Sequence, residues 1–201
     1  MEITGIEFQK KHDDRANLYV DDEFYAGVSV ELVMKNRLKK GMTISKEELD
    51  EIILEDEKQS AFSKAVKYMS SALKTEKQIK DYLRKKEYNP GTIEYVIAKL
   101  IEYKYLDDEA YARSFVLTYS SKYGKLKLIA GLKSKGVSDR VIDNVFNEDL
   151  EIKNNIKETA EKYLKNKIID NNTYLKLSRF LYSRGYEFDE INRVINELKG
   201  K

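Results

Sequence analysis

The fold is decided by residues 79–97, IKDYLRKKEYNPGTIEYVI, because the same apolar pattern recurs twice farther along the chain. The copies are residues 128–146, LIAGLKSKGVSDRVIDNVF, and residues 177–195, LSRFLYSRGYEFDEINRVI. Each copy begins 49 positions after the preceding one. Six columns are apolar in all copies: Ile79, Leu128 and Leu177; Leu83, Leu132 and Leu181; Tyr88, Val137 and Tyr186; Ile93, Ile142 and Ile191; Val96, Val145 and Val194; and, farther upstream, Val66, Phe115 and Leu164. This period is typical of stacked helical units that complete one another's core.

Each copy predicts three helices. In the first copy, the first helix spans about residues 58–71, and the sequence TEKQ beginning at Thr75 is a capping box that opens the second. Asn89 and Pro90 open the third, as N-cap and first helical residue. Later copies carry glycine after the second helix, at Gly136 and Gly185, where a left-handed residue commonly ends a helix; the first copy has Glu87 there.

The N-terminal residues alternate between apolar and polar up to about residue 28, as expected for strands, and Asp21-Asp22-Glu23 reads as a hairpin turn. A short helix is expected from about Val30 to Lys39, stopped by Gly41. The sequence SKEE beginning at Ser45 is a second capping box, so another helix should start there and run toward the first repeat.

The expected fold is therefore mainly α. A small head with a β-hairpin or three strands plus a helix precedes three tandem three-helix repeats, which form a curved, elongated array. The expected domains are the head (residues 1–57) and the repeats (residues 58–106, 107–149 and 150–201).

Composition narrows the class of protein. Of the 201 residues, 41% are hydrophobic, enough for a folded core, and none is cysteine, which excludes disulfides and thiolate chemistry. No apolar run approaches the roughly 20 residues of a membrane span. We expect a soluble, cytoplasmic monomer.

Residues 1–59 carry a net charge of −6 and residues 60–201 a net charge of +8, so the repeats are basic. A basic surface can attract nucleic acid or an acidic protein face, although lysine-rich helices are often simply solvated.

The sequence shows no recognisable catalytic motif. The single histidine, His12, is expected in an exposed turn, and no glycine-rich phosphate cradle is present. Asp107-Asp108-Glu109 could in principle bind a divalent ion, but a helix start explains these carboxylates better. The 15 tyrosines suggest base stacking, yet most fall on core-facing columns. We expect a protein that is not an enzyme and holds no cofactor or metal.

The candidate binding residues are basic side chains of the first two repeats. Stacked repeats could align them into a positive stripe that meets phosphates or acidic side chains. The candidates are Arg113, Lys122, Lys125, Lys127, Lys133 and Lys135 in the second repeat and Arg84, Lys85 and Lys86 in the first.

The second repeat also carries a family resemblance. Its segment YLDDEAYAR at residues 105–113, followed by Gly124 and by LKSKGV at residues 132–137, resembles the central signature of the RecX family of recombinase regulators. The three tandem repeats are similar to that family over about residues 60–200, and the head resembles the N-terminal extension of some members. Arg113, Lys125 and Lys127 match basic positions around the signature and are the leading candidates for contacts. Lys133 and Lys135 are the next candidates.

This resemblance implies a non-enzymatic protein that binds the filament of the RecA recombinase on DNA. It would suppress ATP hydrolysis, strand exchange and repressor co-cleavage, and so modulate homologous recombination, DNA repair and the SOS response. Two points stay open: whether the basic residues contact the recombinase or DNA, single- or double-stranded, and whether the regulator inhibits or stimulates. The alternative function is a stand-alone nucleic-acid-binding protein, because basic three-helix units resemble helix-turn-helix modules.

Overall fold

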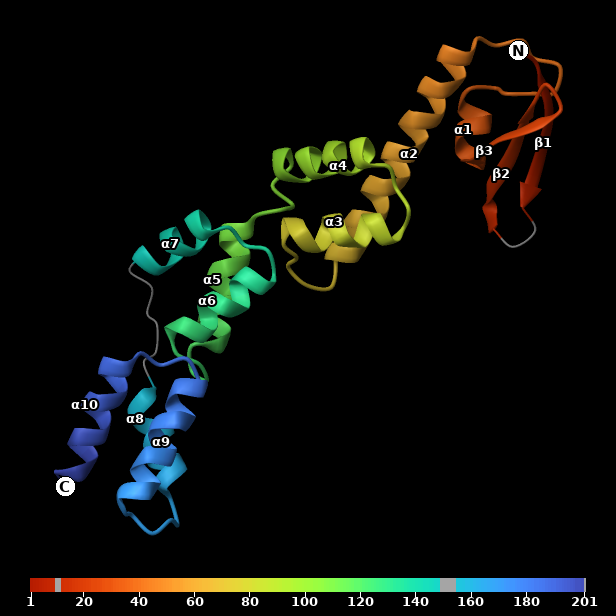
Figure 1. Ribbon diagram of the computed structural model, residues 1–201. Coiled ribbons are helices and arrows are strands. Elements are labelled where there is room, and N and C mark those ends of the chain that lie inside the picture. The colour runs from red at the N-terminus through yellow and green to blue at the C-terminus, as the bar shows by residue number, and fades with distance from the viewer. Residues whose placement is uncertain (10–11, 149–154, 201) are drawn as a thin grey trace. The chain divides into compact units, whose positions relative to one another are not determined.

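The structure, a computed structural model, describes residues 1–9, 12–148 and 155–200 (Figure 1). It divides into two compact units, one of residues 1–72 with 79–105 and one of residues 73–78 with 106–201. The elements of the head and first repeat are β1 (Ile3–Gln9), β2 (His12–Val20), β3 (Glu23–Ser29), α1 (Val30–Lys35), α2 (Lys46–Met69), α3 (Glu76–Lys85) and α4 (Pro90–Glu102). Those of the second and third repeats are α5 (Asp108–Tyr119), α6 (Lys125–Ser134), α7 (Asp139–Asn147), α8 (Ile156–Leu164), α9 (Asn171–Ser183) and α10 (Phe188–Lys199).

The head is a three-stranded antiparallel sheet in the order β1-β2-β3. Val20 pairs with Glu23 across the predicted hairpin turn, and the two aspartates between them have φ angles of 50° and 69°. Two consecutive positive φ angles define the turn whose twist matches paired strands. The hairpin prediction is confirmed, whereas His12 is the first residue of β2, paired with Gln9, and not part of a turn.

Helix α1 ends at Lys35, four residues before the predicted end at Lys39. Arg37 takes a left-handed φ of 51°, and the Leu38 N–H donates to the carbonyl of Val33 at 2.9 Å. This hydrogen bond belongs to a helix-ending motif that usually has glycine at the left-handed position. The prediction placed the end near Gly41 because it relied on glycine as the marker.

Helix α2 is continuous across the expected boundary between residues 57 and 58. It starts after Ser45, whose Oγ accepts from the Glu48 N–H at 3.1 Å, and runs without glycine, proline or a second cap to Met69. One long helix therefore belongs to both the head and the first repeat. It packs against β3 and α1 and, farther along, against α4.

The predicted caps of the first repeat are present. Thr75 and Gln78 form the reciprocal capping box, with the Gln78 N–H donating to the Thr75 hydroxyl at 3.2 Å and the Thr75 N–H to Gln78 Oε1 at 3.0 Å. Asn89 Oδ1 accepts from the Thr92 N–H at 2.8 Å and opens α4, with Pro90 as its first residue. Local hydrogen bonding thus fixes where these helices begin.

Apolar columns of the second and third helices of the repeats are confirmed as core. Leu83, Leu132 and Leu181 are fully buried, and the isoleucine and valine columns are also buried in every repeat. In the upstream column, however, Val66 is exposed and Phe115 is half-buried, so only Leu164 is buried there. Two sets of buried residues match between the first helices: Ala61, Ala112 and Ala160, and, one turn later, Ala65, Val116 and Leu164. These triplets are spaced by 51 and 48 residues, because the connections between first and second helices differ in length.

Consecutive middle helices meet at tight joints within the second unit. Gly136, which follows α6 with a φ of +84°, lies against the first turn of α3, where a Cβ on it would be 2.5 Å from the Cβ of Lys77. Gly185, which follows α9 with a φ of +86°, lies against the first turn of α6 in the same way. Only glycine fits such a joint, because both the backbone angle and the space exclude a side chain.

The first repeat ends its middle helix with the same left-handed residue although glycine is absent. Glu87 has a φ of 63°, and the Tyr88 N–H donates to the carbonyl of Leu83 as its counterparts do in the other repeats. Glu87 is exposed, so its side chain meets no joint, and the strain is confined to the backbone.

Candidate interaction surface

The nine predicted binding residues lie on or beside the middle helices, apart from Arg113 on α5. All except Arg113 are exposed. Lys122, Lys125 and Lys127 surround the start of α6, Lys133 and Lys135 its end, and Arg84, Lys85 and Lys86 the end of α3.

Arg113 is engaged inside the second repeat. Its Nε and Nη2 donate to the two carboxylate oxygens of Glu148 at 2.7 and 2.8 Å, and Nη2 also donates to Glu109 at 3.2 Å. Asn144 completes the network through a hydrogen bond to Glu109. The hydrogen bond to Glu148 raises the pKa of Arg113, and the same contact holds the pKa of Glu148 below its ordinary value. Arg113 therefore ties α5 to the residue that caps the end of α7.

Two further candidates have carboxylate partners. Lys133 contacts Asp139 at 2.7 Å, and Arg84 contacts Asp81 at 3.1 Å. Both pairs are exposed, and such pairs usually contribute at most about 1 kcal/mol to stability. A binding partner could displace them at little cost.

The remaining six cations have no carboxylate within 4.0 Å among the described residues: Lys85, Lys86, Lys122, Lys125, Lys127 and Lys135. Lys127 Nζ instead donates to the carbonyl of Ser183 at 3.0 Å and lies 5.4 Å from the ring centroid of Tyr123. Lys125 Nζ lies 5.6 Å from the ring centroid of Phe146. The start of α6 is thus positively charged without local neutralisation.

Sequence reasoning missed Arg184. Its guanidinium carbon lies 5.8 Å from the Tyr123 ring centroid, on the side chain that Lys127 also contacts, and 5.1 Å from that of Phe180. The repeat contained the signal, because Lys86, Lys135 and Arg184 occupy one column, directly before the left-handed residue. The predicted binding residues included Lys86 and Lys135 of this column but not Arg184 in the third repeat.

The acidic segment at the start of α5 forms helix caps. Asp107 Oδ1 accepts from the Ala110 N–H at 2.9 Å, and Asp108 Oδ1 accepts from the Glu76 N–H at the start of α3, also at 2.9 Å. Burial raises the pKa of Asp108, while the hydrogen bond from Glu76 acts in the opposite direction. Within residues 1–9, 12–148 and 155–200, no group of three or more carboxylate or histidine side chains is arranged to hold a metal ion. The helix-start interpretation is confirmed.

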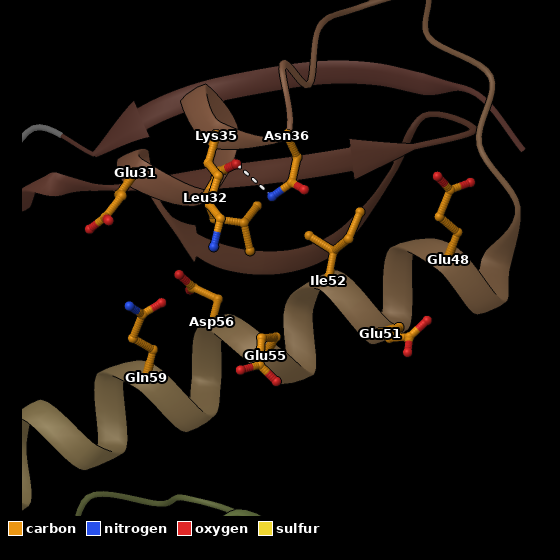
Figure 2. Close-up of a pocket in the computed structure, with 10 residues that line it drawn as sticks. All are labelled: Glu31, Leu32, Lys35, Asn36, Glu48, Glu51, Ile52, Glu55, Asp56 and Gln59. Carbon is orange, nitrogen blue, oxygen red and sulfur yellow. Dashed lines mark hydrogen bonds between the residues drawn. The ribbon is translucent and has the colours of Figure 1, made fainter.

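Figure 2 shows a second charged feature, a groove of about 400 Å³ between α1 and α2 in the head. Its lining residues are Glu31, Leu32, Lys35, Asn36, Glu48, Glu51, Ile52, Glu55, Asp56 and Gln59. The Asp56 carboxylate is already hydrogen-bonded within the head, because it accepts from the backbone N–H and the hydroxyl of Ser29. The groove accounts for much of the acidity of the head.

Most tyrosines are half-buried at the edge of the core, and only Tyr186 among the described residues is buried, so fewer tyrosines fill the core than predicted. Tyr186 is buried, Tyr88 bonds Ser60 through its hydroxyl at 2.9 Å, and Tyr82 stacks on Tyr68 with centroids 4.2 Å apart. In the described part of the chain no helix is both long and apolar enough to cross a bilayer. The fold and these residues define a helical-repeat protein with a small β-sheet head and exposed basic side chains on or beside its middle helices.

Comparison with known proteins specifies the class further. Residues 1–45 match the regulatory protein RecX N-terminal domain, and residues 61–100, 107–145 and 151–195 match the first, second and third three-helix domains of RecX. The chain therefore belongs to the RecX family of regulatory proteins. The expected boundary between the second and third repeats, at residues 149 and 150, lies outside the described residues.

Relatives resemble the chain over nearly its full length. Regulatory protein RecX of Clostridium acetobutylicum is 38% identical, with 98% of this chain and 95% of that protein aligned. The namesake from Clostridium tetani is 37% identical, covering 98% and 94% of the two chains. A crystal structure of RecX from Lactobacillus salivarius superposes with a TM-score of 0.65 at 26% identity, covering 73% of this chain and 99% of that one. Another crystal structure of a regulatory protein RecX has a TM-score of 0.69 at 24% identity over 98% of both chains and supports the fold.

Proposed function

We propose that this protein is a negative regulator of the RecA recombinase that binds the RecA–DNA filament. It would suppress ATP hydrolysis, strand exchange and co-protease activity, and so modulate recombination, repair and the SOS response. The observation that carries the proposal is the match of the head and all three repeats to the RecX regulatory family. The tandem repeats with unneutralised cations support action by binding and not by catalysis.

Filament contacts are assigned first to the exposed cations of α6 that have no carboxylate partner, Lys125 and Lys127, with Lys122 and Lys135 beside them. Lys85 and Lys86, in the first repeat, are separate candidates for filament contacts. On binding, Lys133 and Arg84 would exchange their carboxylate partners within the chain for anionic groups of the filament. For Arg113, the bidentate pair with Glu148 favours a positioning role, because a filament contact would have to break two short hydrogen bonds.

The test is ATP hydrolysis by RecA on single-stranded DNA with increasing amounts of the purified protein. Substoichiometric protein should slow hydrolysis, because capping or breaking one filament affects many subunits. Unchanged hydrolysis and filament length at equimolar protein would contradict the proposal. Faster hydrolysis would reverse the sign of regulation while keeping the partner. We further propose that the protein acts in the cytoplasm as a monomer, which sedimentation of the free chain would test.

A second candidate function is stand-alone binding of nucleic acid. The observation that favours it is the set of cations around Tyr123 without neighbouring carboxylates. Salt-dependent binding to bare DNA, with no effect on any recombinase reaction, would support this function over filament regulation.

A further inference from the structure

Two repeats bring cations onto one aromatic ring. Tyr123 precedes α6, and Lys127 Nζ of α6 lies 5.4 Å from its ring centroid. Arg184, which follows α9 in the third repeat, places its guanidinium carbon 5.8 Å from the same centroid. Lys122 is adjacent in sequence and exposed. We call Lys122, Tyr123, Lys127 and Arg184 the joint cluster, since it lies where Gly185 meets α6.

The joint cluster lacks the carboxylate that the other joint possesses. At the start of α3, Asp108 accepts from the Glu76 N–H. The first helices of the second and third repeats are 48 positions apart, so the residue equivalent to Asp108 is Ile156, the first residue of α8, which carries no carboxylate. In the part of the chain that the structure describes, no carboxylate lies within 4.0 Å of the joint cluster's cations.

The charges at the start of α6 oppose helix stability. The first turn contains Lys125 and Lys127 and no acidic residue, and Gly124 offers no capping side chain. Cations near the positive end of a helix dipole are unfavourable, so this sequence is poor for folding alone. The N–H of Leu126 already donates to the carbonyl of Gly185 at 3.0 Å. This backbone N–H is therefore not available to an anion. An anion that neutralised the positive charge at the start of α6 would be bound by the side chains of the joint cluster.

We propose that the joint cluster binds the phosphodiester backbone of a single nucleic-acid strand. Arginine and lysine side chains that have no carboxylate partner among the described residues suit phosphate oxygens. Tyr119, which is 38% exposed with its ring centroid 6.4 Å from that of Tyr123, supplies an aromatic surface for an unpaired base. Stacking of an unpaired base on Tyr119 strengthens the binding of a single strand. It does not strengthen the binding of an acidic protein face or of a paired duplex.

This inference deepens the proposed function by assigning the joint cluster to the DNA of the filament, and it also gives the strand a structural effect. A phosphate held by Lys127 and Arg184 would bridge the second and third repeats across the Gly185 joint. Binding would then hold these two repeats together.

The experiment measures binding of a labelled oligothymidylate to the full chain by fluorescence anisotropy across a salt series. Lys127→Gln with Arg184→Gln should weaken affinity at least about tenfold and reduce the slope of log affinity against log salt by about 1.4, for two lost phosphate contacts. Tyr119→Leu should weaken affinity roughly tenfold with little change in slope. Should the double variant lose its helical circular dichroism, Lys127→Gln alone should lower the slope by about half that amount.

The matched control is Lys157→Gln with Lys162→Gln, which removes the same charge from lysines paired with Glu197 and Glu158. It should change affinity less than about threefold. Equal losses in the two double variants, or a parent chain that does not bind the oligothymidylate, would overturn the proposal. Tighter binding of duplex or of polyglutamate would also overturn it, in favour of double-stranded DNA or an acidic protein. RecA hydrolysis is measured separately, so filament regulation can fail while strand binding holds, and the reverse.

Discussion

The carbonyl of Gly185 accepts a hydrogen bond from the N–H of Leu126 at 3.0 Å, although 59 positions separate the two residues in sequence. A Cβ on Gly185 would be 2.4 Å from the Cβ of Lys127, so the third repeat meets the second backbone to backbone. The joint thereby fixes the surface on which Arg184 and Lys127 reach Tyr123.

Gly185→Ala should destabilise the protein by roughly 2–5 kcal/mol, because left-handed strain adds to steric overlap at the joint. The matched control is Gly41→Ala, where φ is also positive, +83°, but no atom lies within 4 Å of the added Cβ. It should cost only about 1–2 kcal/mol, from strain alone. Urea denaturation of both variants measures the difference, and equal losses would show that the joint tolerates a side chain.

Glu87→Gly should stabilise the first repeat by about 1 kcal/mol. Relief of the left-handed strain at a φ of 63° exceeds the extra entropy that glycine gives the unfolded chain. Glu51→Gly, at an exposed position within α2, provides the opposite control and should destabilise, because glycine is a poor helix former. Thermal unfolding distinguishes them, and a destabilised Glu87→Gly variant would contradict the strain argument.

Leu132→Ala should destabilise the protein by roughly 2–5 kcal/mol, because the side chain is fully buried in the core of the second repeat. Leu126→Ala, on the same helix but 45% exposed, should cost less than about 1 kcal/mol. A loss below about 1 kcal/mol for Leu132→Ala in chemical denaturation would mean that the repeat columns do not mark the core.

The pair of Arg113 and Glu148 should make stability pH-dependent. The folded-state pKa of Glu148 lies below its ordinary value of 4.5, so its contribution is present above that pH and is lost as the pH falls through the depressed pKa. Glu148→Gln should therefore flatten the stability profile below about pH 4.5, relative to the parent chain. Glu94→Gln, at an exposed carboxylate paired with Lys80, is the comparison. Identical profiles for the parent chain and Glu148→Gln would show that the pair contributes nothing.

Lys125→Glu with Lys127→Glu should weaken filament binding strongly while leaving folding intact, since acidic residues are favourable in the first turn of α6. Lys39→Glu with Lys40→Glu, on the exposed surface of the acidic head, controls for the same change in charge. Co-sedimentation with RecA filaments at two salt concentrations measures both. Equal filament affinity for the α6 variant and the parent chain would leave these lysines as solvated surface. Arg113→Glu is tested separately, because its loss also breaks the contact with Glu148.

The sequence by itself determined the helical repeats, the hairpin and most helix starts. These features depend on short-range chemistry: an N-cap side chain such as Asn89 reaches the N–H three residues on, and apolar residues one helical turn apart share a face. The same reasoning misplaced the end of α1, because arginine replaces glycine at the left-handed residue Arg37. It also misplaced the core column of the first helices, where connections of unequal length break the 49-residue spacing.

Only the tertiary structure decided which cations remain available for binding. Arg113 and Lys127 look alike in sequence, yet Arg113 is held by Glu148, 35 residues away, while Lys127 meets Tyr123 and the third repeat. Such partners depend on how helices pack, and packing depends on the volumes and backbone approaches of residues distant along the chain. The bidentate pair therefore emerges only when α5 and α7 pack together, and the joint cluster only when the joint at Gly185 is formed.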